Sequence, residues 1–381
     1  MLNKVEKILL YLYALLIPSI TATRFDGFSL GRGMVLLLVA VNLFDFVYNR
    51  KTIIISRKII GIVALYVFWM VASLLWTPDS CLEQGLIRTL FTIVVCSFYL
   101  LICGKGVTES EFSIIKNNIM IGGVLSALLL IIFGGNYYGD EEEVRYSLTS
   151  STDPNFYSMY LITPIAIAYN KMRLNDGKNK IKFTVYMLLM SYTIIICGSR
   201  GALLALGIMG LIELLRRKKY IVIGIIILGI YLGFESVGEI YPRFEISELA
   251  KGAGRSFIWA VIAEMIKDNF IFGVGVSGIK GTYDDYAIQA GIGFLVGHGR
   301  DPHNAYMEIL AELGIIGFSL YMGIVLYSLC NNYKKHSEDM TVGVIGTLVA
   351  ATFLTSVLEE PIWFYFALLA MKSKSIKNNV A

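Results

Sequence analysis

The sequence predicts an all-α fold, a polytopic membrane protein with about 12 transmembrane helices. Two observations predict it. The hydrophobic fraction is 56%, the charged fraction 16% and the mean hydropathy +0.66, whereas soluble domains have about 45–50% apolar and about 25% charged residues. Apolar runs of roughly 15–25 residues, the length that crosses a bilayer core, also recur along the whole chain. In lipid every backbone polar group must bond internally, so these runs are expected to be helices.

The predicted helices follow one another through the chain, which we interpret as a single integral membrane domain over residues 1–381. The first apolar segment, residues 8–20, lacks a small-residue cleavage site and is therefore interpreted as the first helix rather than a signal peptide. The predicted spans lie near 5–22, 33–48, 59–76, 86–103, 113–134, 155–170, 182–197, 201–215, 220–235, 305–330, 341–357 and 361–372.

The Lys and Arg residues predict the orientation, because cytoplasmic loops carry the positive charge. With both termini inside, the inner loops hold two thirds of the 33 Lys and Arg residues, and the acidic run 140–143 falls outside. The basic run 216–219 then resembles a membrane anchor near anionic lipid. Membrane lipids are therefore expected partners and nucleic acid is not.

One connection, residues 236–304, is long and rich in aromatic residues, Ile and Gly, so we expect it to be ordered and functional. Within it, Ser256–Asn269 is predicted as an amphipathic helix on the membrane surface, with a packed cap over the bundle as the alternative. Gly273–Gly278 matches G-x-G-x-x-G. It follows a helix rather than a strand, so we reject a dinucleotide site and predict a flexible glycine loop.

The end of this connection carries the candidate base. Asp301 suits a helix N-cap and Pro302 the first helical position, which would place His303 in the first turn of a membrane helix. A helix N-terminus attracts anions and disfavours imidazolium, so His303 would stay neutral and could accept a proton. His298, in the same connection, is the alternative candidate for the base. A metal site of His298, Asp301 and His303 is a weaker alternative, and the five cysteines form no C-x-x-C pair. We predict neither a metal nor a cofactor.

Two arginines on the outer side are predicted to bind phosphate. Arg200 lies in a tight turn between two apolar helices, where charge is costly and usually functional. Arg255 opens the amphipathic helix. The guanidinium group binds phosphate through a bidentate fork. The alternative for each is a pair with a nearby carboxylate or a lipid headgroup.

Several acidic residues accompany these positions. Asp153 precedes Pro154 and is read first as the N-cap of the sixth span. Glu308 and Glu312 share one helix face and either orient His303 or pack near the headgroups. The Glu359-Glu360-Pro361 sequence is read first as another helix start.

These elements together resemble the O-antigen ligase and polymerase superfamily. Its histidine–asparagine element, followed by an apolar helix with a glutamate-x-glycine step, is similar to residues 302–317 here. The Ser-Arg-Gly-Ala turn at 199–202 is similar to its first arginine element, and residues 254–259 with 273–275 resemble its second. Asp153-Pro154-Asn155 also occurs in such proteins. The resemblance covers roughly residues 150–370.

The resemblance implies a metal-independent, inverting glycosyltransferase of the bacterial cytoplasmic (inner) membrane with an extracytoplasmic site. The donor would be an oligosaccharide on undecaprenyl diphosphate, and the acceptor either a lipid-linked repeat or a lipid A core. His303 would be the catalytic base, Arg200 and Arg255 would bind the diphosphate, and Asn304, Asp301, Glu312 and Asp153 would support them.

A polymerase is the favoured function, and two alternatives to it stay open. An Ile-, Lys- and Asn-rich composition indicates an AT-rich gene of the kind found in surface-polysaccharide loci, which favours a polymerase of O-antigen or capsular repeat units, with a chain-length regulator as a further partner. A ligase acting on lipid A core is the first alternative. A secondary transporter or flippase is the second, because 12 spans with both ends inside is a common transporter plan. The absence of a clear internal repeat and the sparse intramembrane charge argue against it.

Overall fold

The computed structural model is all-α, which confirms the predicted fold class. It describes residues 4–25, 28–48, 55–105, 107–138, 145–150, 152–220, 255–297, 299–330, 338–355 and 357–371. These residues form thirteen α-helices and two short antiparallel hairpins. The predicted span at 220–235 beyond its first residue, residues 236–254 of the long connection and His298 lie outside the described residues.

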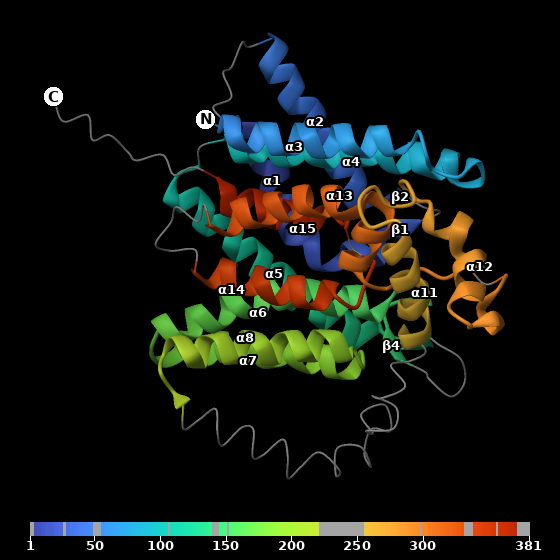
Figure 1. The fold of residues 1–381 in the computed structure, drawn as a ribbon. Coiled ribbons are helices and arrows are strands. Elements are labelled where there is room, and N and C mark those ends of the chain that lie inside the picture. The colour runs from blue at the N-terminus through green and yellow to red at the C-terminus, as the bar shows by residue number, and fades with distance from the viewer. Residues whose placement is uncertain are drawn as a thin grey trace.

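The elements follow one another in chain order, and Figure 1 shows their arrangement. The helices are α1 (Lys4–Leu16), α2 (Leu30–Tyr48), α3 (Arg57–Ser73), α4 (Leu82–Gly104), α5 (Glu109–Phe133), α6 (Pro154–Leu174), α7 (Gly177–Ile196), α8 (Arg200–Arg216), α11 (Arg255–Asp268), α12 (Ile279–Gln289), α13 (Ala305–Cys330), α14 (Glu338–Ala351) and α15 (Glu360–Ala370). Short 3-10 turns lie at Ile17–Thr23, Asp79–Cys81 and Gly293–Leu295. The strands are β1 (Arg24–Phe25) with β2 (Phe28–Ser29), and β3 (Gly135–Tyr138) with β4 (Arg145–Ser147).

Most helices lie within a few residues of their predicted positions, because the length of each apolar run limits the helix that it forms. The predicted amphipathic helix is α11. The sequence did not predict α12 or the hairpins, which are short and polar. The span expected to reach residue 357 ends at Ala351, where the chain turns toward α15.

Four segments of the described residues are long and apolar enough to cross a membrane: Leu30–Tyr48, Asp79–Gly104, Glu109–Phe133 and Ala305–Cys330. Large apolar side chains are also exposed on the outer faces of the helices, among them Phe44 on α2, Phe68 on α3 and Phe133 on α5. Water disfavours such surfaces and lipid accepts them. The structure therefore agrees with a membrane protein, and the number of 12 crossings stays a prediction.

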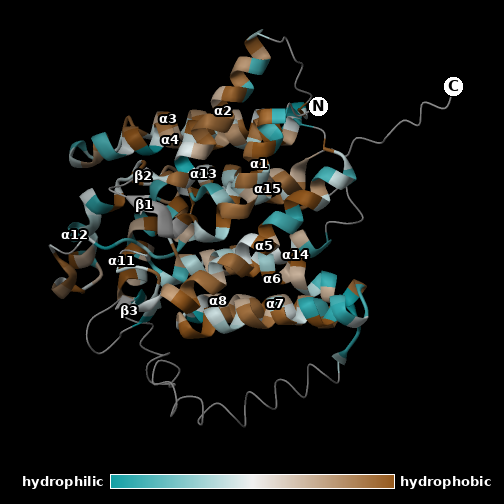
Figure 2. Cartoon of the chain, turned by 180° about the vertical axis from the view of Figure 1, so that it is seen from behind, coloured by the Kyte–Doolittle hydropathy of each residue, from teal (hydrophilic) through white to brown (hydrophobic). Residues whose placement is uncertain are grey.

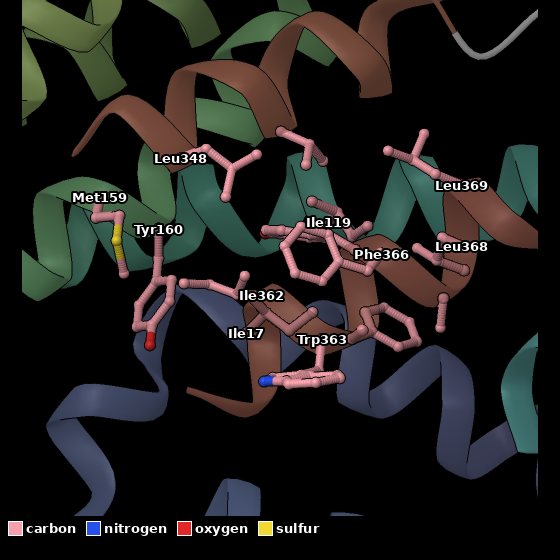
Figure 3. Close-up of a cluster of buried hydrophobic side chains, with 14 of the residues drawn as sticks. Ile17, Ile119, Met159, Tyr160, Leu348, Ile362, Trp363, Phe366, Leu368 and Leu369 are labelled. Atoms are coloured by element: carbon pink, nitrogen blue, oxygen red, sulfur yellow. The ribbon is translucent and has the colours of Figure 1, made fainter. Parts of the chain in front are cut away.

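The short helix α15 forms the centre of the core. All eleven of its residues are buried, including Trp363 and Phe366. Figure 3 shows these two aromatic side chains among Ile17, Ile119 of α5 and Leu348 of α14. A helix that is apolar on every side is stable only when neighbours cover all of its faces.

Ion pairs connect helix ends at one end of the bundle, here called the basic end. Lys7 pairs with Glu111 at 2.7 Å, which joins the starts of α1 and α5. Lys116 pairs with Asp339 at 2.8 Å, which joins the starts of α5 and α14. The ends of α6 and α8 meet there through Arg173 and Glu213 at 2.8 Å. Figure 2 shows hydrophilic residues at this end of α7, and hydrophobic residues along the helix.

The opposite end, here called the α11 end, carries α11 and α12 (Figure 1). A glycine-containing loop there, residues 270–276, fits into a break in α13. At the break Gly314 has a φ of 63° and leaves the helical conformation. The backbone N–H groups of Val274 and Gly275 donate to the carbonyls of Ala311 and Glu312, each at 2.9 Å.

Two further hydrogen bonds satisfy other backbone groups at the break in α13. Ile315 N–H donates to the Phe270 carbonyl at 2.8 Å, and Trp69 Nε1 donates to the Leu313 carbonyl at 2.8 Å. Backbone groups inside an apolar bundle need such partners. The prediction of a flexible glycine loop is therefore wrong. The glycines permit close approach of one backbone to another, and the loop is held by hydrogen bonds.

Gly273→Ala should lower the free energy of unfolding by about 2–4 kcal/mol, because left-handed strain costs about 1–3 kcal/mol and the clash of the new Cβ with the backbone of α13 adds to it. Gly273 has a φ of +73°, and an added Cβ would lie 2.3 Å from the Glu312 carbonyl oxygen. Denaturation in detergent measures the change. Gly297→Ala is the matched control, because Gly297 has a φ of +81° but no neighbour within 4 Å among the described residues. Equal losses in the two variants would contradict the close contact.

Candidate functional site

His303 lies two residues before the start of α13 at Ala305 rather than in its first turn. The Oδ1 atom of Asn304 accepts hydrogen bonds from the backbone N–H groups of Tyr306 and Met307, both at 3.1 Å, so Asn304 is the N-cap. The predicted cap at Asp301 is wrong. Asn and Asp cap equally well, and the Asp301 carboxylate instead lies 3.3 Å from Lys280 Nζ.

The backbone of His303 is strained. Its φ is 46°, a left-handed value that is uncommon for any residue other than glycine. The flanking residues are fixed, because the Pro302 carbonyl accepts a hydrogen bond from Trp259 Nε1 at 2.9 Å and Asn304 caps α13. Strain of this kind persists only where the surroundings enforce it, and it concentrates at functional sites.

Burial lowers the pKa of the His303 imidazole, and the positive charge of Arg255 lowers it further. Asp301 and Asp153 act in the opposite direction with smaller effects. The result is an imidazole that stays neutral, and able to accept a proton, at a lower pH than a solvent-exposed histidine. The helix N-terminus predicted the same direction, whereas the main cause in the structure is burial.

Arg255 and the turn that carries Arg200 meet at Phe353, just beyond the end of α14. The Arg255 guanidinium donates to the Phe353 carbonyl at 3.0 Å. From another direction, a Cβ added to Gly201 would lie 2.9 Å from the Phe353 ring, so the start of α8 packs closely on the same residue. The Trp259 and Phe353 rings are 6.4 Å apart. One aromatic residue thus connects the two arginine-bearing segments.

Asp153 is the N-cap of α6, as predicted. Its Oδ1 atom accepts from Asn155 N–H at 2.8 Å and from Asn155 Nδ2 at 3.0 Å, and Pro154 is at the start of the helix. Its charge also acts on His303. The structure therefore brings Asp153 and Arg255, which lie far from His303 along the chain, within electrostatic range of His303.

Glu312 does not contact His303. Together with Glu308 it binds Arg88 of α4: Arg88 Nη1 donates to the Glu312 carboxylate at 2.9 Å, and Arg88 Nη2 donates to Glu308 Oε1. Both carboxylates are buried, with 5% and 4% of their side chains exposed. The alternative in which the two glutamates orient His303 is therefore wrong.

Arg88 was not predicted as a site residue from the sequence. Its position in the sequence could have indicated a role, because Arg88 lies within the apolar run of the fourth span. An ionisable side chain there is costly and usually has a partner or a function. Its partners could not be identified from the sequence, since they lie more than 200 residues away along the chain.

A cavity of about 380 Å³ adjoins this cluster at the α11 end. Asp301 and Pro302, which immediately precede His303, form part of its wall. Its charged lining consists of Arg32, Arg88, Lys280, Asp301, Glu308, Glu312 and Glu359. The volume lies in the usual range of about 300–1,000 Å³ for small-molecule sites.

The metal alternative lies partly outside the described residues, because His298 does. Within the part of the chain that the structure describes, no group of three His, Cys, Asp or Glu side chains is arranged to hold a metal ion. The described cysteines are all free.

Comparison with known proteins agrees with the motifs at this end of the bundle. Residues 185–322 match the family model described as O-Antigen ligase, a segment that includes Arg200, Arg255 and His303. The resemblance to that family is thereby confirmed. A provisionally named polysaccharide ligase of Rickettsia conorii is 27% identical over 289 residues, which is 70% of this chain and 66% of that protein. One from Rickettsia typhi is 26% identical over 301 residues, which is 73% of this chain and 68% of that protein.

Proposed function

We propose that this chain, which carries an O-antigen ligase family domain, is an extracytoplasmic glycosyltransferase that uses an undecaprenyl diphosphate-linked glycan donor. One observation carries the proposal. A strained, half-buried histidine with a lowered pKa lies within electrostatic range of Arg255, at the end of the bundle where the Arg200 turn also packs. A base beside cationic groups is the arrangement that displacement of a diphosphate requires.

In the proposed reaction, neutral His303 removes the proton from an acceptor hydroxyl. The hydroxyl oxygen attacks the anomeric carbon of the donor sugar as the bond from that carbon to the phosphate oxygen breaks. Undecaprenyl diphosphate leaves with the bonding electron pair, and the direct displacement inverts the anomeric centre. Arg255 and Arg200 would compensate the charge that develops on the leaving diphosphate.

The charge distribution supports an extracytoplasmic site. The basic end holds Lys7, Lys116 and Arg173, and cytoplasmic segments of membrane proteins carry the excess of Lys and Arg. The α11 end would then face outward. A donor on that side would have to come attached to lipid, in agreement with a diphosphate-linked carrier.

Polymerase and ligase are both compatible with this site. The composition favours a polymerase that joins lipid-linked repeats, whereas the names of the Rickettsia relatives favour a ligase. Purified protein in nanodiscs, given the native lipid-linked repeat, tests both. A ladder of lengthening glycan from the repeat alone indicates a polymerase, and a single transfer that requires lipid A core indicates a ligase. No transfer in either mixture would contradict the proposed function and favour a transporter.

Arg255→Ala should weaken donor binding by about 10- to 100-fold, since a hydrogen bond to a charged group contributes roughly 1.5–3 kcal/mol. The donor affinity of Arg255→Lys should lie between those of the wild type and Arg255→Ala, because lysine keeps the charge but loses the bidentate fork. Titration of labelled donor measures the dissociation constant. Lys267→Ala, at the far end of α11 in an exposed pair with Glu264, is the control. Unchanged donor affinity in Arg255→Ala would exclude its role in phosphate binding.

A further inference from the structure

The wall of the cavity at the α11 end contains two buried polar atoms that no described protein group satisfies. Among the residues that the structure describes, Glu308 Oε2 and Thr355 Oγ1 have no hydrogen-bond partner, and both residues line the cavity. Glu308 as a whole is only 3% exposed. Buried polar groups in folded proteins almost always have partners, so two in the wall of one cavity point to a ligand.

The local structure explains why these atoms have no protein partner. Arg88 uses Nη2 on Glu308 Oε1 and Nη1 on Glu312, which leaves the second oxygen of Glu308 open. Thr355 lies between α14 and α15, in the connection that follows Phe353. The same connection therefore carries the Arg255 contact and one wall of the cavity.

The charge of the cavity favours a neutral ligand. Arg32, Arg88 and Lys280 are its cations, and Asp301, Glu308, Glu312 and Glu359 are its carboxylates. Arg88 and Lys280 are paired with carboxylates of the same wall. Arg32 pairs with Glu360 at 3.2 Å. Because the lining has no excess of positive charge, it suits a hydroxyl-rich molecule better than a diphosphate.

The position of the cavity suits the acceptor. Asp301 and Pro302 line it, and His303, the next residue along the chain, lies beside this wall rather than in the lining. Arg255 lies near His303 but does not line the cavity. A sugar in the cavity could therefore present a hydroxyl to the base while the diphosphate stays beside Arg255. The volume of about 380 Å³ is sufficient for a sugar residue.

We propose that this cavity is the acceptor subsite, in which Glu308 Oε2 and Thr355 Oγ1 bind hydroxyl groups of the terminal sugar of the acceptor glycan. The proposal rests on the proposed glycosyltransferase function. Arg88 positions Glu308 by holding its other carboxylate oxygen.

Thr355→Val tests the subsite most directly. It preserves the side-chain shape and removes a hydroxyl that has no partner in the described part of the chain, so the fold should be retained. Glu308→Gln is the second variant, because it keeps the shape and removes the charge. Thr193→Val is the matched control, since Thr193 is buried in α7 and donates to its own helix at Leu189, away from the cavity.

The assay uses lipid-linked donor and a soluble acceptor, the repeat-unit oligosaccharide released from native donor by mild acid. If the wild type requires lipid A core, the soluble acceptor is core oligosaccharide instead of the repeat-unit oligosaccharide. We expect Thr355→Val to raise the acceptor KM by roughly 3- to 10-fold, the usual effect of one lost hydrogen bond. Glu308→Gln should raise it by about 10-fold or more, because its hydrogen bond is charge-assisted. The donor KM should stay within about twofold in both variants.

An unchanged acceptor KM in both variants, in a protein whose wild type transfers glycan, would overturn the subsite alone. A raised donor KM with an unchanged acceptor KM would also overturn it, because the cavity would then hold the donor sugar. Failure of the wild type to transfer glycan to either acceptor is a different result, which would overturn the proposed function and the subsite with it.

Discussion

His303→Asn should lower kcat for glycan transfer by about 10²–10⁴-fold, the usual contribution of a positioned general base. Asn is the substitution of choice because His303 has a φ of 46°, and Asn tolerates this left-handed conformation better than most residues. The effect should fall on kcat, since removal of the proton takes place in the transition state, and donor affinity should stay within about twofold. Transfer assays with titration of labelled donor measure the two quantities.

The pH dependence gives an independent test of the same residue. The base acts in its neutral form, and the pKa of His303 lies below the ordinary value of 6.5 because of burial and Arg255. As the pH rises, kcat/KM should increase through a midpoint below 6.5 and then reach a plateau. His303→Asn should remove this acidic limb. Full activity in the variant, or an unchanged acidic limb, would exclude His303 as the base.

Arg88→Met should lower the free energy of unfolding by about 3 kcal/mol. It leaves two buried carboxylates, Glu308 and Glu312, without their shared cation, and breaking a buried ion pair in this way costs about 3–5 kcal/mol. We expect the lower part of that range, because 20% of the Arg88 side chain is exposed. Unfolding of the purified protein in detergent measures the loss.

The triple variant Arg88→Met, Glu308→Gln and Glu312→Gln is the control for that prediction. It removes all three charges together, and replacing a whole buried ionic group by neutral side chains is often close to neutral for stability. The triple variant should therefore recover most of the stability that Arg88→Met loses. If it is no more stable than Arg88→Met, packing rather than uncompensated charge explains the loss.

The sequence by itself determined where most helices begin and end. Apolar run length limits each membrane helix, and local cap chemistry sets its start, as Asp153 and Pro154 do for α6. These effects act over a few neighbouring residues. The candidate site residues His303, Arg200 and Arg255 were found in the same way, from unusual residues at the predicted ends of helices.

Predictions from neighbouring residues were wrong in two situations. In one, two residues were equally good helix caps, and in the other, a segment distant in sequence made the deciding contact. Asp301 and Asn304 are equivalent caps by sequence. In the structure the carboxylate of Asp301 lies near Lys280 of α12, and Asn304 caps the helix. The glycine loop looked flexible because its partner, the break in α13 at Gly314, is not adjacent in sequence.

Only the tertiary structure decided which helix ends meet. It joins Arg88 to Glu308 and Glu312, places Arg255 on Phe353, and leaves Glu308 and Thr355 with unpaired atoms in one cavity. The physical reason is that these contacts depend on packing between helices distant in sequence, on which apolar periodicity carries no information. The sequence thus determined the helices and the chemical groups at their ends, and the packing of the bundle determined which of those groups share a site.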